Sequence, residues 1–360
     1  MNYFTKSFLA AFSFCLFTVI CQAQTPLPAA APAADTTKKD VPLSITGGVD
    51  AYYRYSGSKA GSLTSYTGAS NAFQLGTANI VVAKDLGKIG FVADLFWGQR
   101  AQETNYNYNL PTTTLTAIKQ LYVTYKPSDK LKFTLGQFTT FFDYELIEAY
   151  NNLNYSMSYT FSNGPFFHTG LKAEYAITPE FSALVGIFDI TDTKGFSDNK
   201  HFGAQLGYAK GSFKGYLNFL TGTGIDSASN TNINFVGSYQ VTPKFGLGVN
   251  VETKSVSPYT KSGNSTSNSW TGIAIYANYA VSDKFVLALR GENFDDKKNI
   301  VGYGTTINEL TLSGNIKIDA LTIIPEIRFD SAGDNKKLFG TGTNASVSDF
   351  SFLLAAVYKF

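Results

Sequence analysis

Apolar and polar side chains alternate with a period of two along most of the chain from residue 44 onward. In residues 44–55, Ile45, Val49 and Tyr53 fall on one face, whereas Asp50 and Arg54 fall on the other. Strict alternation of this kind predicts β-strands that expose one apolar and one polar face. The chain is therefore expected to be all-β.

About sixteen such segments follow one another, each about as long as a strand needs to cross a bilayer at a tilt. They are expected at 44–55, 72–84, 88–98, 115–126, 131–138, 166–177, 181–190, 201–210, 213–222, 231–241, 245–256, 269–281, 285–294, 305–318, 321–330 and 350–360. The 15% aromatic content favours strands. A mean hydropathy of -0.05 fits a wall with one apolar face and one wet face.

The connections between these segments alternate between short and long. The short ones carry turn residues, as in 85–88, 127–130 and 242–244, and the long ones, such as 56–71 and 331–349, are rich in Asn, Ser, Thr and Gly. Short periplasmic turns and long extracellular loops are typical of bacterial outer-membrane barrels. A sheet can cross hydrocarbon only if it closes on itself, and about sixteen strands enclose an aqueous lumen.

The N-terminus has the pattern of a secretory signal peptide. A basic Lys6 precedes an apolar run at 8–20, and we expect cleavage after Ala23. A single membrane anchor and a lipoprotein modified at Cys21 are the alternatives. Both cysteines lie in this segment, so the mature chain is expected to have none. We predict that residues 24–42 form a disordered periplasmic tail. Residues 43–360 are predicted to form a single barrel domain in the outer membrane.

The C-terminal segment alternates and ends in Tyr358-Lys359-Phe360. A terminal aromatic residue on an outward-facing strand resembles the signal by which outer-membrane proteins are recognised for barrel assembly. We therefore predict that Tyr358 and Phe360 form this signal. The alternative is an ordinary apolar strand that ends in Phe.

Many charged residues share the inward phase of the predicted strands. On the lipid face at the bilayer midplane, a basic side chain would cost about 2–4 kcal/mol, so these residues are expected to face water. The candidate pore-lining residues are Asp50, Arg54, Asp94, Lys172, Glu174, Arg290, Glu292, Glu326 and Arg328, with Glu252, Lys254 and Glu309 on the same phase. They would either set the electric field of the lumen or form salt bridges that stiffen the wall.

The connection at 139–165 is long, acidic and aromatic, and its first half lacks a period of two. Long loops inside compact domains are often functional. We hypothesise that it folds into the lumen and narrows it, with Asp143, Glu145 and Glu148 at the constriction. The alternative is an extracellular loop packed on the rim.

Several functional classes are disfavoured. The formal net charge of +2 argues against a nucleic-acid partner. His168 and His201 are the two histidines, and neither lies near a nucleophile motif, so no catalytic residue is predicted. Paired His/Cys spacings for a metal and phosphate-binding loops are absent, so no metal and no cofactor are expected.

Five strings, at 47–55, 89–101, 117–138, 154–175 and 282–296, resemble the OmpL-like β-barrel porin family of Bacteroidetes-type bacteria. The segments NYSMSY, GPFFHTG and LALRGENFDD are the most specific of these. The resemblance implies a passive outer-membrane channel for small polar solutes or ions. It makes a homotrimer plausible, with outer-membrane lipid and the barrel-assembly machinery as further partners. The alternative is a barrel with a non-transport role, either a hydrolase or an adhesin that displays its loops.

Overall fold

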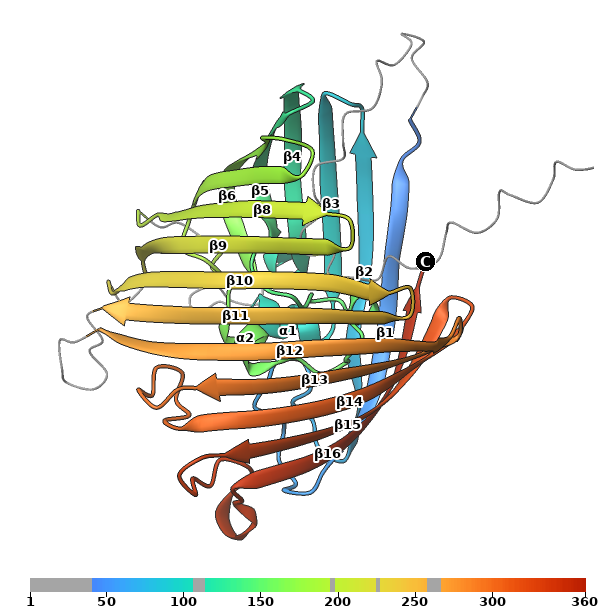
Figure 1. Ribbon diagram of the computed structural model, residues 1–360, viewed down its shortest axis with the longest axis vertical. Helices are drawn as coiled ribbons and strands as arrows, with labels where there is room; N and C mark the ends of the chain where they lie inside the picture. Colours follow the sequence, from blue (N-terminus) through green and yellow to red (C-terminus); the bar gives the residue numbers. More distant parts are fainter. Residues whose placement is uncertain (1–40, 106–113, 195–197, 225–226, 258–266) are drawn as a thin grey trace, which may run out of the picture.

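The computed structural model describes residues 41–105, 114–194, 198–224, 227–257 and 267–360, which form one closed antiparallel barrel of sixteen strands (Figure 1). The strands are β1 Ser44–Ser56, β2 Ala72–Asp85, β3 Ile89–Trp97, β4 Ile118–Ser128, β5 Leu131–Thr139, β6 Phe167–Ala176, β7 Phe181–Phe188, β8 His201–Lys210, β9 Phe213–Thr223, β10 Ser229–Thr242, β11 Phe245–Ser257, β12 Asn268–Ser282, β13 Phe285–Asp295, β14 Thr306–Ile318, β15 Leu321–Ala332 and β16 Ser348–Lys359. Each predicted segment overlaps one of these strands, and the ends differ by at most three residues.

Each strand pairs with its neighbours in sequence, and β1 pairs with β16 to close the wall. The closing register places Asp50 opposite Val357 and Gly48 opposite Lys359. Because the sheet has no free edge, its backbone donors and acceptors are paired within the protein, as hydrocarbon requires.

The two faces of the wall differ as the alternation predicts. Large apolar side chains such as Phe73, Leu206 and Val185 are exposed on the outer face. Inward residues of the same strands, such as Arg54 on β1 and Asn218 on β9, are buried inside the barrel. A barrel with an apolar outer face suits a lipid environment. Among the described residues, no helix is long and apolar enough to cross a membrane.

Connections at one end of the barrel are tight turns, and those at the other end are long. Gly87 and Gly211 adopt positive φ angles of 84° and 58° in two of the tight turns, a conformation that glycine adopts without strain. We call these two ends the short-turn end and the long-loop end. The assignment of the short-turn end to the periplasm stays a prediction. The signal peptide and most of the tail lie outside the described residues.

The connection between β5 and β6, residues 140–166, lies inside the barrel, and we call it the lumen segment. Its helix α2, Tyr159–Asn163, begins after Ser158, whose hydroxyl accepts a hydrogen bond from the Phe161 amide. Helix α1, Gln99–Thr104, follows β3 and packs against β2 and β3. Figure 1 shows both helices between the near and far sides of the wall.

Candidate functional site

The lumen segment contacts the wall on opposite sides of the barrel. Near its start, the Phe141 carbonyl accepts a hydrogen bond of 3.1 Å from Gln205 on β8. Further along, the Tyr150 hydroxyl lies 3.0 Å from the amide nitrogen of Asn79 on β2, and Asn154 donates to Ser313 on β14 over 2.7 Å. The segment therefore crosses the lumen instead of lining one side of it.

The three acidic residues of the segment are buried against the wall, with exposed fractions of 0% for Asp143, 3% for Glu145 and 6% for Glu148. Asp143 accepts a hydrogen bond of 2.8 Å from Asn250 on β11. Glu145 and Glu148 form ion pairs with Arg290 on β13 and with Lys119 on β4, respectively. These carboxylates hold the segment in place and have little contact with water.

Two wall carboxylates bind the backbone of the segment. Glu326 on β15 accepts hydrogen bonds from the Tyr155 and Ser156 amides, at 2.7 and 3.1 Å. Glu292 on β13 accepts from the amides of Tyr159 and Thr160, both at 2.6 Å. Hydrogen bonds to charged acceptors are stronger than neutral ones, so both residues fix the path of the backbone.

Arg290 and Arg328 complete this network from neighbouring parts of the wall. Arg290 Nη1 lies 2.5 Å from Glu145 Oε1 and 2.6 Å from the Ser156 carbonyl, while its Nε donates to Glu309 over 3.0 Å. Arg328 pairs with Asp330 at 2.8 Å and donates to the Met157 carbonyl over 2.7 Å. The planar guanidinium can donate several hydrogen bonds at once, which suits it to join wall and segment.

A row of amide side chains runs across four neighbouring strands and ends on the segment. Gln205 donates to Asn218, Asn218 to Asn234, and Asn234 to Asn250, at 2.8, 2.7 and 2.7 Å. Asn250 then donates to Asp143. Each of the three asparagines both accepts and donates within the row, and Asp143 is its final acceptor.

Inward glycines leave room for side chains of the segment. A Cβ on Gly48 would lie 2.5 Å from the Tyr150 ring, and one on Gly248 would overlap the ring of Tyr144. Tyr144 also stacks on Tyr276 of β12, with ring centroids 4.1 Å apart. These glycines are therefore explained by close approach of the segment to the wall.

Every one of the sixteen strands has at least one inward side chain that is no more than 5% exposed. Among them are Tyr52, Asn79, Asp94, Lys119, Phe138, His168, Phe188, His201, Asn218, Asn234, Asn250, Ala274, Arg290, Thr311, Arg328 and Leu353. Four of them, Tyr52, Leu353, Phe138 and Phe188, belong to hydrophobic clusters that include residues of the lumen segment. In this conformation, protein side chains fill the middle of the lumen.

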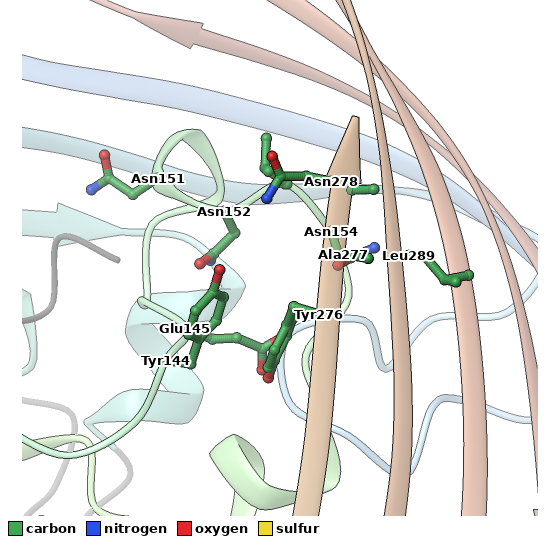
Figure 2. Close-up of a pocket in the computed structure, with 11 residues that line it drawn as sticks. Tyr144, Glu145, Asn151, Asn152, Asn154, Tyr276, Ala277, Asn278 and Leu289 are labelled. Carbon is green, nitrogen blue, oxygen red and sulfur yellow. The ribbon is translucent and has the colours of Figure 1, made fainter. Parts of the chain in front are cut away.

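A cleft separates part of the segment from β12 and β13. Its empty space is about 440 Å³, counting the open solvent at its mouth, and Asn151, Asn152 and Asn154 line it together with Asn278 and the Tyr276 ring. Figure 2 shows Asn151 and Asn152 on the segment and Asn278 on the facing strand. The cleft has a mixed lining, in which these amides alternate with apolar residues such as Leu153 and Leu289, and its one charged residue, Glu145, pairs with Arg290.

The candidate residues named from the sequence thus fall into two groups. Asp50, Arg54, Asp94, Arg290, Glu292, Glu326 and Arg328 lie on the inner wall but are buried, whereas Lys172 and Glu174 are partly exposed nearer the short-turn end. Tyr358 and Phe360 lie exposed at the end of the chain, and their role as an assembly signal stays a prediction.

Sequence reasoning missed Lys119, Arg100 and the three asparagines of the amide row. Arg100 donates to the Ile147 and Tyr155 carbonyls from helix α1. The asparagines at 218, 234 and 250 repeat every sixteen residues, and this spacing was the available signal. Within the described ranges, no group of His, Cys, Asp and Glu is placed to hold a metal ion.

Residues 42–360 match the sequence profile of the family described as "Putative beta-barrel porin-2, OmpL-like". No curated protein sequence matches the chain.

Several solved structures share the fold. The anion-selective porin from Comamonas acidovorans has a TM-score of 0.61 at 11% identity, covering 89% of this chain and 100% of its own. The outer membrane channel DcaP of Acinetobacter baumannii has a TM-score of 0.59 at 13% identity, covering 91% and 100%. The trimer form of OmpT from Vibrio cholerae has a TM-score of 0.57 at 13% identity, covering 89% and 99%.

Proposed function

This chain belongs to the OmpL-like family of β-barrel porins, and we propose that its lumen segment is the constriction that limits diffusion of small polar solutes or ions. The protein is an outer-membrane porin and not an enzyme. The observation that carries the proposal is the path of residues 140–166, which contact the wall from β2 to β14 across the lumen.

The route that we propose follows the amide-lined cleft between the segment and β12–β13. Solutes would pass there when the segment moves away from the wall, because the surrounding inward side chains are buried in the docked conformation. Asparagine side chains offer both donors and acceptors, which suits hydrated polar solutes. Displacing a segment held by buried ion pairs is costly, so we expect a small conductance.

Reconstitution into planar bilayers tests the proposal. We expect discrete conductance steps that are small for a barrel of sixteen strands. A barrel that serves as an adhesin or hydrolase would give no steps at any voltage. Heat-modifiable migration on SDS gels would show in parallel that the reconstituted protein is folded.

Conductance should also depend on pH through Asp143. Its pKa is raised well above the usual value, first by burial and then by the neighbouring Glu252 charge, with Glu145 adding to the effect. The docked segment therefore binds more protons than the released one above the ordinary aspartate pKa, so docking weakens as pH rises toward the raised pKa. We expect conductance to increase from acidic to alkaline pH.

Asp143→Asn is the matched variant for this prediction. Asp143 has a φ of 69°, and Asn tolerates this left-handed conformation while keeping a side-chain acceptor for Asn250. An amide does not titrate, so the pH dependence of the conductance should shrink in this variant. An unchanged pH profile would show that Asp143 does not control docking.

The oligomeric state and the remaining partners stay predictions. One structural neighbour is described as a trimer form, which supports a homotrimer as our proposal for this chain. Outer-membrane lipid and the barrel-assembly machinery are proposed on the basis of the exposed apolar outer face and the C-terminal aromatic residues.

A further inference from the structure

The structure sorts the inward charges of the wall by their contact with water. The buried carboxylates of the wall are Asp50, Asp94, Glu252, Glu292, Glu309, Glu326, Asp330 and Asp349. The inward charges that keep some exposure are mainly lysines, namely Lys126, Lys132, Lys172, Lys214, Lys254 and Lys317, with Lys359 exposed at the end of β16. The whole chain has nearly balanced charges, but among the partly exposed inward side chains of the described strands lysines outnumber the carboxylates, which are Asp85 and Glu174.

The buried carboxylates are engaged by protein donors. Glu292 and Glu326 bind backbone amides of the lumen segment, Glu309 pairs with Arg290, and Asp330 pairs with Arg328. An ion in the lumen therefore cannot contact them directly. Their charge is also largely offset by the neighbouring guanidinium groups and amide dipoles.

Most of the accessible lysines lie toward the short-turn end. Lys126 pairs with Asp85, and Lys132 and Lys172 share Glu174, at 2.7 and 3.8 Å. These lysines therefore outnumber the acidic groups beside them.

Lys214, Lys284 and Lys317 are among the other lysines at this end. None of them forms a salt bridge with a carboxylate in the part of the chain that the structure describes. Lys214 and Lys317 share the inward phase of the buried Tyr216 and Asn315, whereas Lys284 lies in the turn before β13.

One lysine lies directly beside the lumen segment. Lys359 Nζ is 3.3 Å from Asn151 Oδ1 and 5.0 Å from the Tyr150 ring centroid. Asn151 also lines the cleft between the segment and β12. A positive charge therefore stands next to the proposed route, on its short-turn side.

We propose that this porin prefers small anionic solutes, such as carboxylates and phosphates, and that the lysines at the short-turn end supply the preference. This inference rests on the proposed diffusion function. A mouth with an excess of one sign of charge raises the local concentration of the opposite ion, and low-dielectric walls focus this field. Basic rings select anions in other pores by the same physics.

The test is the reversal potential of the reconstituted protein in a KCl gradient. We expect the wild-type potential to have the sign of preferential chloride permeation. The double variant Lys214→Glu/Lys317→Glu should shift it toward the potassium equilibrium potential. Because screening weakens charge effects in salt, the shift should shrink as total KCl is raised.

Lys210→Glu is the matched control. Lys210 and Lys214 belong to the same β8–β9 hairpin, but Lys210 shares the outward phase of Tyr208 and Lys214 the inward phase of Tyr216. The control should leave the reversal potential unchanged, although it alters the charge by the same amount as Lys214→Glu alone, which is recorded beside it. Equal shifts in both variants would show that overall charge, and not the inward lysines, sets selectivity.

The outcomes separate the two proposals. Conductance steps with cation preference in the wild type would overturn the anion inference and leave the diffusion function standing. Absence of conductance in folded protein would overturn both. With sodium acetate or sodium phosphate in place of KCl, continued anion preference would extend the inference to carboxylates or phosphates, and its loss would restrict it to chloride.

Discussion

Replacing residues 142–152 with a Gly/Ser linker of the same length is expected to raise the single-channel conductance several-fold. The exchange removes the Glu145–Arg290 and Glu148–Lys119 ion pairs and the Tyr144 ring from the lumen. A Gly/Ser chain is flexible, and its small side chains cannot fill the space beside Gly248 and Gly48 that the rings of Tyr144 and Tyr150 occupy. Length is kept because Phe141 and Leu153 contact opposite sides, on β8 and β14.

A second exchange controls for general loosening of the barrel. Residues 341–345 lie in the long connection before β16 and are mostly exposed, so a Gly/Ser replacement there should leave the conductance unchanged. Single-channel recordings of both variants, with ion selectivity measured alongside, provide the comparison. If the 142–152 exchange leaves current and selectivity as in the wild type, the lumen segment is not the constriction.

The wall of this barrel was predictable because a strand has a period of two. Ile45 and Asp50 must lie on opposite faces of β1, and the same holds for each later strand. The alternation therefore predicts that Arg290 and Glu292 face the inside of the barrel, where the structure has them buried. The tight turns could also be predicted from the sequence, because glycines such as Gly87 and Gly211 adopt the positive φ that these turns require.

The contents of the lumen were not predictable in the same way. Alternation tells which side of the wall a residue faces, but not what covers it. Glu292 was expected to face water, yet it is buried because it accepts the amides of Tyr159 and Thr160, more than 130 residues earlier in the chain. The lumen segment has no regular hydrophobic period, so its sequence does not show which of its residues contact which residues of the wall.

The number of strands also does not predict what fills the lumen. Sixteen strands define a lumen wide enough for water, but the number of strands does not determine what occupies that lumen. The lumen segment fills the middle of that space, and its acidic trio binds the wall instead of facing solution. Mid-strand glycines such as Gly48 and Gly248 were the overlooked clue, because a strand interior without a side chain often marks a close approach.

Arg290→Met should cost about 3–5 kcal/mol of stability, because it leaves the buried Glu145 carboxylate without its counterion. Arg290 is fully buried and pairs with Glu145 of the lumen segment and Glu309 of β14. Its removal leaves Glu145 without this partner, leaves Glu309 with the 4.0 Å contact to Arg328, and frees the Ser156 carbonyl. The denaturant midpoint of the detergent-solubilised barrel should fall clearly below that of the wild type.

Two further variants identify the cause of that loss. In Arg290→Met/Glu145→Gln, the unpaired charge of Glu145 is gone, so part of the stability should return. The ion pair between wall and segment is lost in both variants, so we expect a higher conductance than in the wild type for each. Lys297→Met breaks an exposed pair with Asp295 at 3.9 Å, where we expect a change of at most about 1 kcal/mol. Equal midpoints for Arg290→Met and Lys297→Met would mean that the network does not hold the segment. A stability loss without increased conductance would mean that the segment stays docked by its other anchors, chiefly the backbone amides bound to Glu292 and Glu326.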